Sequence, residues 1–148
     1  MKKSLKRILI ILVILCISGC KRNSIIKEKE LEKVSNKNKL IVVDVKEQFE
    51  ERKQVKEAYV LDSGKNWQIE YYIFDTKENA KEMFEKNKND FKSLKSKKDK
   101  EEDKETIYTT TTNDYYMYIS IIDNSVLYIK VPTKVKDEAK EIIKELKY

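Results

Sequence analysis

Cys20 is the residue whose chemistry the sequence defines most clearly. Four basic residues among the first seven precede an unbroken apolar run of ten residues, Ile8 to Ile17. Ser18 and Gly19 then place two small side chains directly before the Cys20 thiol. A basic head, a short apolar stretch and small residues at its end are typical of a secretory signal. The run is too short for a transmembrane helix, which needs about 20 residues. Residues 1–19 are therefore predicted to be a cleaved signal peptide.

The four residues that end this segment, Ile17-Ser18-Gly19-Cys20, resemble the lipobox of bacterial lipoproteins. The resemblance implies that the Cys20 thiol carries diacylglycerol, with acyl chains such as palmitate, and that the chain is cut before Cys20. Stable anchoring takes two acyl chains, which this one modification supplies. The mature chain is thus expected on the extracytoplasmic face of the cell membrane. An ordinary signal peptide, with Cys20 incidental, and an uncleaved anchor remain alternatives.

Charge argues against nucleic acid as a partner, although the whole chain carries a net charge of +6. The leader holds four of the 32 basic residues and no acidic residue. The remaining chain thus has 28 basic and 26 acidic residues, a net charge of +2. Dense but balanced charge is typical of a solvated surface and not of a polyanion-binding face.

Most catalytic chemistry is excluded by composition. The chain has no histidine, both cysteines lie at or before residue 20, and Gly64 is the single glycine after the leader. Histidine triads, thiol nucleophiles and glycine-rich phosphate loops therefore have no basis here. Asp44, Asp62 and Glu70 lie on or beside predicted strands, without a pairing signal, and are interpreted as surface or turn residues. The sequence predicts no enzyme, no cofactor and no metal site.

Tyrosines are the other candidates for function. If helices cover one face of a sheet, rings such as Tyr72, Tyr116 and Tyr118 remain exposed on the other face and can contact a partner. The competing interpretation is cross-strand packing, which stabilises a sheet without any partner.

The elements that must position these residues follow from periodicity. Alternation of apolar and polar residues predicts strands at 40–45, 55–62, 67–74, 106–112, 115–122 and 125–131, with a hairpin turn at Gly64. Asp75 and Glu78 form a helix-start pattern, and apolar spacing continues that helix to Phe91. A second helix is predicted after Thr133 and extends to the end of the chain.

The arrangement of these elements predicts one α+β domain at 40–148. We expect an antiparallel sheet of five to six strands with two main helices on one face. Two hairpin-helix blocks, at 55–91 and 115–148, suggest two ββα repeats related by a pseudo-dyad. The alternative is that the two helices are alike only because both are amphipathic and rich in lysine. Residues 20–39 are predicted to form a tether with a short helix. The charged run 92–105 is predicted to be a mobile loop, because it has too little apolar surface to become ordered.

Four stretches of residues 40–148 resemble small, uncharacterised lipoproteins of clostridia-like, low-GC Gram-positive bacteria. The stretches are IVVDVKEQF, WQIEYYIFDTKENAKEMF, IIDNSVLYIKV and KDEAKEIIKELKY. The resemblance implies a lipoprotein but transfers no activity and no site residue.

Two functions remain open from the sequence. The first is a lipid-anchored, non-enzymatic module that uses Tyr72, Tyr116 and Tyr118 to contact an envelope protein or wall polymer. The second is a lipoprotein that binds a small ligand in a pocket between sheet and helices. The sequence leaves the oligomeric state open.

Overall fold

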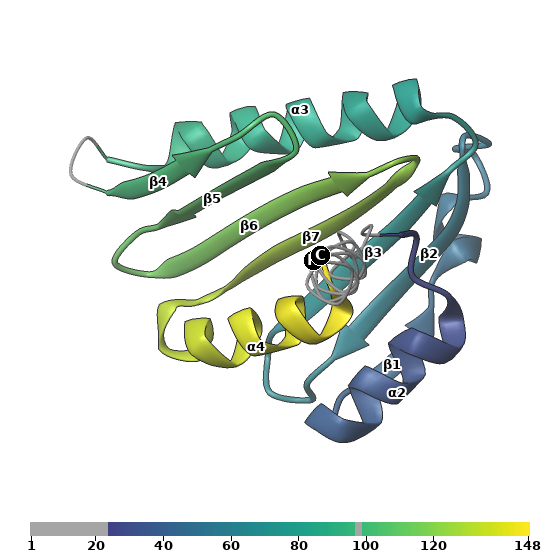
Figure 1. Cartoon of the computed structure of the whole chain (residues 1–148), viewed down its shortest axis with the longest axis horizontal. Helices are drawn as coiled ribbons and strands as arrows, with labels where there is room; N and C mark the ends of the chain where they lie inside the picture. The colour runs from purple at the N-terminus through teal and green to yellow at the C-terminus, as the bar shows by residue number, and fades with distance from the viewer. Residues whose placement is uncertain (1–23, 97–98) are drawn as a thin grey trace, which may run out of the picture.

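The computed structural model describes residues 24–96 and 99–148 (Figure 1). The predicted signal peptide at 1–19 and the predicted lipidation site Cys20 lie outside these residues. The elements are, in chain order, α2 (Glu28–Asn38), β1 (Ile41–Asp44), the 3-10 helix η1 (Lys46–Phe49), β2 (Val55–Asp62), β3 (Gln68–Phe74), α3 (Lys77–Leu94), β4 (Lys100–Asp103), β5 (Ile107–Thr111), β6 (Tyr115–Ile122), β7 (Ser125–Pro132), the 3-10 helix η2 (Thr133–Val135) and α4 (Lys136–Leu146).

The strands form one antiparallel sheet in the order β1-β2-β3-β7-β6-β5-β4. Two hairpins, β2-β3 and β6-β7, meet at the centre, where Tyr71 of β3 pairs with Leu127 of β7. Gly64 and Asp123 adopt positive φ angles of 65° and 57° in the hairpin turns, the region that glycine and aspartate tolerate best. The predicted α+β class with an antiparallel sheet is confirmed, and the sheet has seven strands instead of five to six.

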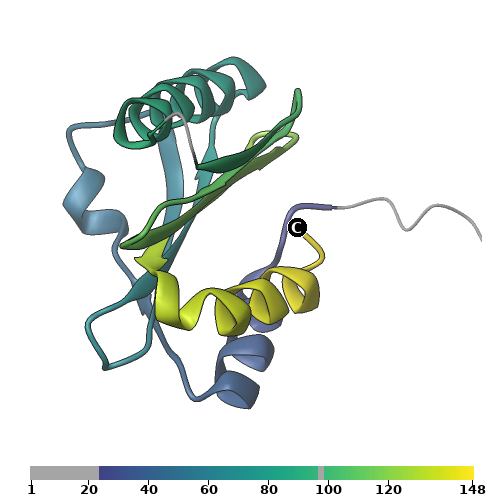
Figure 2. The same ribbon diagram turned by 90° about the vertical axis from the view of Figure 1, so that its left-hand side faces the viewer.

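Both faces of the sheet carry a buried core. Side-chain alternation sends Tyr71 and Leu127 toward α2 and α4, and sends their chain neighbours Tyr72 and Val126 toward α3. Figure 2 shows the sheet between α3 on one side and α2 with α4 on the other. The expectation of two main helices on one face is therefore wrong. Central strands that are apolar on both faces need a helix on each side.

The expected pseudo-dyad between two ββα repeats is also wrong. The order hairpin then helix occurs twice, as β2-β3-α3 and as β6-β7-α4. A two-fold axis that exchanges the antiparallel neighbours β3 and β7 must run perpendicular to the sheet. Such an axis keeps both helices on one face, whereas α3 and α4 lie on opposite faces. The similar helix sequences thus reflect amphipathic composition.

Residues 24–39 belong to the folded domain, which corrects their prediction as part of a tether. The predicted short helix is present as α2, and its Leu31 is fully buried. Ile26 is 3% exposed, and its backbone N–H donates to the Tyr71 hydroxyl over 2.9 Å. Because the apolar stripe of α2 packs beside α4, the domain begins about 15 residues earlier than expected.

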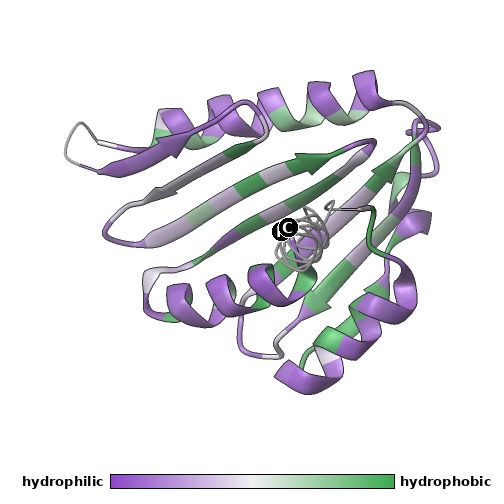
Figure 3. Ribbon diagram, in the orientation of Figure 1, coloured by the Kyte–Doolittle hydropathy of each residue, from purple (hydrophilic) through white to green (hydrophobic). Residues whose placement is uncertain are grey.

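The segment 92–105 is largely ordered, so its prediction as a mobile loop is wrong for the residues described. Helix α3 continues to Leu94, and β4 pairs with β5 although it is strongly hydrophilic (Figure 3). Ion pairs hold this segment where apolar burial is small. Asp103 contacts the ammonium groups of both Lys88 and Lys92, at 2.5 and 2.6 Å. Residues 97 and 98 lie outside the described part.

Candidate functional site

The three tyrosines singled out from the sequence are buried and do not form one surface. Tyr72, Tyr116 and Tyr118 are 7%, 3% and 6% exposed, respectively. Tyr72 belongs to the core under α3, whereas Tyr116 and Tyr118 belong to the core on the α2 and α4 face. Their prediction as exposed partner contacts is wrong, because each ring is packed into one of the two core clusters. The packing interpretation describes these rings better.

Tyr116 and Tyr118 nevertheless lie at the base of a cavity of about 500 Å³. Helix α4 packs on β7 and against α2. Within the described residues, no helix covers β4, β5 and β6 on this face (Figure 1). The space between α4 and these strands remains open, and we call it the cationic groove. Its main lining residues are Lys100, Glu102, Ile107, Thr109, Thr111, Tyr116, Tyr118, Lys136, Lys140, Ile143 and Tyr148.

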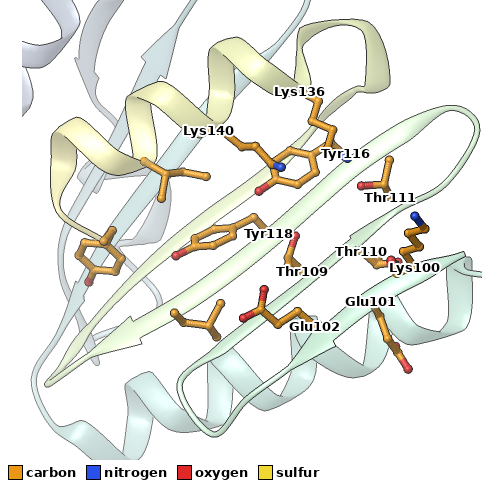
Figure 4. Close-up of a pocket in the computed structure, with 13 residues that line it drawn as sticks. Lys100, Glu101, Glu102, Thr109, Thr110, Thr111, Tyr116, Tyr118, Lys136 and Lys140 are labelled. Atoms are coloured by element: carbon orange, nitrogen blue, oxygen red, sulfur yellow. The ribbon is translucent and has the colours of Figure 1, made fainter.

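Strand alternation selects which side chains of β4 enter the cationic groove. Lys100 and Glu102 occupy one face of β4, while Glu101 points away from the groove (Figure 4). The Glu101 carboxylate instead accepts a 2.8 Å hydrogen bond from Tyr108, a residue of the α3 core. Among the described residues, Glu102 is the one carboxylate directed to the groove side, while Glu101 borders the cavity, and Lys104 forms an ion pair with Glu102. Three lysines therefore face one neutralised carboxylate.

Two lysines of α4 lie over the same aromatic ring. The ammonium groups of Lys136 and Lys140, one helical turn apart, are 5.7 and 5.9 Å from the centroid of Tyr116 (Figure 4). These are cation-π distances. Within the part of the chain that the structure describes, neither lysine nor Lys100 lies within 4 Å of a carboxylate. The groove thus has positive charge that no acidic side chain neutralises.

Hydroxyl groups provide hydrogen-bond donors beside this charge. Burial raises the pKa of Tyr118 to about 12. Burial also raises the pKa of Tyr116, although a hydrogen bond with the Thr109 side chain partly offsets the increase. Both phenols are therefore protonated at neutral pH. Ammonium and phenol groups in one cavity of this size are suited to binding a phosphate or carboxylate group.

A second cavity, of about 470 Å³, lies on the opposite face of the sheet, beside α3 and near η1. We call it the acidic groove. Its charged and aromatic lining residues are Phe49, Arg52, Glu70, Tyr72, Phe74, Glu82, Lys86, Asp90 and Tyr128. Tyr72 donates to the Glu70 carboxylate over 2.5 Å, and its ring meets the Phe49 ring edge-on at 5.5 Å. Here the Glu70 carboxylate already accepts a tyrosine hydroxyl, and acidic side chains outnumber basic ones in the lining.

The carboxylates considered from the sequence have local structural roles. Asp44 and Asp62 each accept a 2.8 Å hydrogen bond from a backbone N–H two residues later, which supports a turn. Glu70 accepts the hydrogen bond from Tyr72. Among the described residues, no three acidic, histidine or cysteine side chains are grouped to bind a metal ion. In the same residues, no helix has the length and apolarity needed to cross a membrane.

Sequence reasoning missed the lysines of the cationic groove. The spacing of Lys136 and Lys140 places both on one face of a helix, which is the only signal that the sequence offers. That they lie over Tyr116 depends on which sheet face α4 covers.

No family model, curated protein or solved structure matches this chain. The resemblance to clostridia-like lipoproteins therefore stays a prediction, and the function must be argued from the grooves themselves.

Proposed function

We propose that this protein is a lipid-anchored, extracytoplasmic binding protein that holds a small anionic ligand in the cationic groove. It acts without catalysis. The observation that carries the proposal is the convergence of Lys100, Lys136 and Lys140 on a cavity of about 500 Å³, with no carboxylate of residues 24–96 and 99–148 paired to them.

Size and chemistry favour a phosphate- or carboxylate-bearing ligand. Pockets for small molecules have volumes of about 300–1,000 Å³, so the groove has room for a ligand larger than one ion. Charged donors bind an anion more strongly than neutral donors do, and the groove has three lysines beside the hydroxyl groups of Tyr116 and Tyr118. A wall polymer that bears such groups belongs to the same ligand class.

The anchor is proposed at Cys20. Diacylation of its thiol gives the two chains that stable membrane attachment requires. It places the protein on the extracytoplasmic face of the cell membrane. An envelope protein as partner is a weaker proposal, because the tyrosines that suggested it are buried.

Replacing Cys20 tests the anchor. In cells that produce the full chain, Cys20→Ala should move the protein from the membrane fraction to the soluble or secreted fraction and abolish lipid labelling. Cys16→Ala, which alters the other cysteine of the leader, should leave both readouts unchanged. A Cys20→Ala protein that still fractionates with membranes at an unchanged mass would show that the anchoring proposal is wrong.

Titration with glycerol 3-phosphate tests the groove. Binding to the chain from residue 20 onward, followed by calorimetry or NMR, should weaken about tenfold in the groove variant Lys136→Gln/Lys140→Gln. The matched face control, Lys33→Gln/Lys144→Gln, removes the same charge from exposed positions of α2 and α4 and should bind normally. Equal affinity of the two variants, or no binding by the parent chain, contradicts the proposal.

A further inference from the structure

We propose that the cationic groove faces the membrane to which the protein is anchored, and that its ligand is the phosphate-bearing headgroup of an anionic phospholipid. This inference rests on the proposed function and specifies both the orientation of the domain and the source of the anion.

The N-terminal segment determines how close the domain lies to its anchor. The backbone N–H of Ile26 bonds to the Tyr71 hydroxyl at 2.9 Å, and the Ile26 side chain is buried in the core. Ile26 follows Cys20 by six positions in the chain. At about 3.3–3.6 Å per residue, this stretch spans at most about 20 Å. The surface around Ile26 must therefore lie within about 20 Å of the lipid attached to Cys20.

The cationic groove opens on this same side of the molecule. Figure 2 shows the described chain beginning on the α2 and α4 face, near the C-terminal residue Tyr148. Tyr148 lines the groove, and its ring meets the Tyr71 ring edge-on at 5.8 Å. Tyr71 in turn binds Ile26. Tyr148, at one end of the groove, is thus linked through Tyr71 to Ile26, where the chain leaves the domain toward Cys20.

The lysines beside β4 differ in ion pairing between the two faces of the sheet. On the α3 side, Lys88 and Lys92 are neutralised by Asp103, and Lys95 lies 3.1 Å from Glu101. On the groove side, the three groove lysines have no such carboxylate among the described residues. The three groove lysines therefore lie on the face that the short connection to Cys20 holds near the bilayer, where anionic headgroups attract them.

The lining of the groove suits a headgroup better than a free ion. Ile107 and Ile143 add apolar surface to the lysines and tyrosine hydroxyls. A phosphate ester attached to glycerol presents both an anion and carbon atoms, so it can contact both kinds of surface. Inorganic phosphate can contact only the polar part.

Vesicle binding tests the assignment without help from the anchor. The chain from residue 20 onward, with Cys20→Ser, is mixed with phosphatidylcholine vesicles that contain or lack phosphatidylglycerol. We expect binding only to the anionic vesicles, with about a tenfold or greater loss in the groove variant Lys136→Gln/Lys140→Gln. The face control Lys33→Gln/Lys144→Gln should retain most of the affinity. Circular dichroism confirms that each variant is folded.

Each other outcome overturns a defined part of the inference. Equal losses in the groove variant and the face control would mean that diffuse charge of this face, and not the groove, attracts the membrane. Binding of glycerol 3-phosphate without binding of anionic vesicles would reject the lipid and retain the proposed function. Failure to bind either probe would reject both proposals.

Discussion

The cationic and acidic grooves have a common origin and different contents. Seven strands about 4.8 Å apart form a sheet about 29 Å wide, whereas one helix is about 10–12 Å across. Helices α4 and α3 therefore leave part of each face uncovered. The uncovered part lies over β4, β5 and β6 on the first face, and beside β2 and η1 on the second.

The difference lies in which charges line each groove. In the acidic groove, Glu70, Glu82 and Asp90 outnumber Arg52 and Lys86, and Tyr72 already donates to Glu70. In the cationic groove, Lys136 and Lys140 contact the face of Tyr116 and no carboxylate among the described residues. The two cavities have similar volumes, so the sign of the lining charge, and not the volume, is the discriminating property.

Core truncations behind the two grooves should give the largest effects. Ile142→Ala in α4 and Phe84→Ala in α3 each remove a fully buried side chain. We expect losses of about 2–5 and 3–5 kcal/mol in the free energy of unfolding, respectively, measured by chemical denaturation. Ile142→Ala should also weaken glycerol 3-phosphate binding, because α4 carries two groove lysines. Phe84→Ala, in the helix on the opposite face, should leave the affinity of the folded fraction unchanged. Equal effects on affinity would break the distinction between the grooves.

The sequence predicted the elements that have strong apolar patterns. The alternation from Trp67 to Phe74 and the stripe of the last helix correspond to β3 and α4. It did not predict which face each helix covers, because an amphipathic helix packs equally well on either side of a sheet that is apolar on both. Lys100–Asp103 contains no apolar residue. Its side chains form ion pairs with α3, the helix directly before it in the chain, and an apolar pattern does not reveal such pairs.

The candidate site was predicted only in part. Tyr116 and Tyr118 do line the site, but as buried residues at its base instead of exposed contacts. Lys136 and Lys140 carry no distinguishing sequence signal in a chain with 32 basic residues. Their importance arises because no carboxylate of the described residues pairs with them, which only the three-dimensional arrangement of β4 and α4 defines.

Asp103→Asn should have an intermediate effect on stability. It should loosen the attachment of β4, which forms one wall of the cationic groove, to α3 on the opposite face of the sheet. The substitution removes the carboxylate that Lys88 and Lys92 share. Partly exposed pairs contribute about 1 kcal/mol or less, so we expect a small loss of stability and faster hydrogen exchange in β4. Asp123→Asn is the matched control, because the Lys77 side chain that pairs with Asp123 is 72% exposed. Identical exchange in the two variants would show that the shared carboxylate does not hold β4.

The same pair predicts a pH dependence. Hydrogen bonds from Lys88 and Lys92 lower the pKa of Asp103 below its ordinary value of 3.8. The stabilisation is therefore fully present above that value and is lost as the pH falls through the lowered pKa of the folded state. Protection of β4 amides should decline in this acidic window in the parent chain. In Asp103→Asn, the acid-dependent loss of β4 amide protection that comes from Asp103 should be missing. If the loss of protection is unchanged in this variant, other carboxylates cause it.

Tyr118→Phe should give the smallest effect and the sharpest comparison between the grooves. The change removes one hydroxyl from the cationic groove while keeping the buried ring. One hydrogen bond contributes about 0.5–1.5 kcal/mol, so glycerol 3-phosphate affinity should fall about threefold to tenfold with little change in stability. Tyr72→Phe, the equivalent change in the acidic groove, should leave that affinity unchanged.

The protonation state of Tyr118 strengthens this test. Burial raises its pKa to about 12, so the hydroxyl remains a donor throughout the range from about pH 7 to about pH 9. The ratio of parent to Tyr118→Phe affinity should be constant over that range. A ratio that falls toward one as the pH rises would mean that the phenol ionises early and no longer donates to the anion. The cationic groove would then depend on its lysines alone.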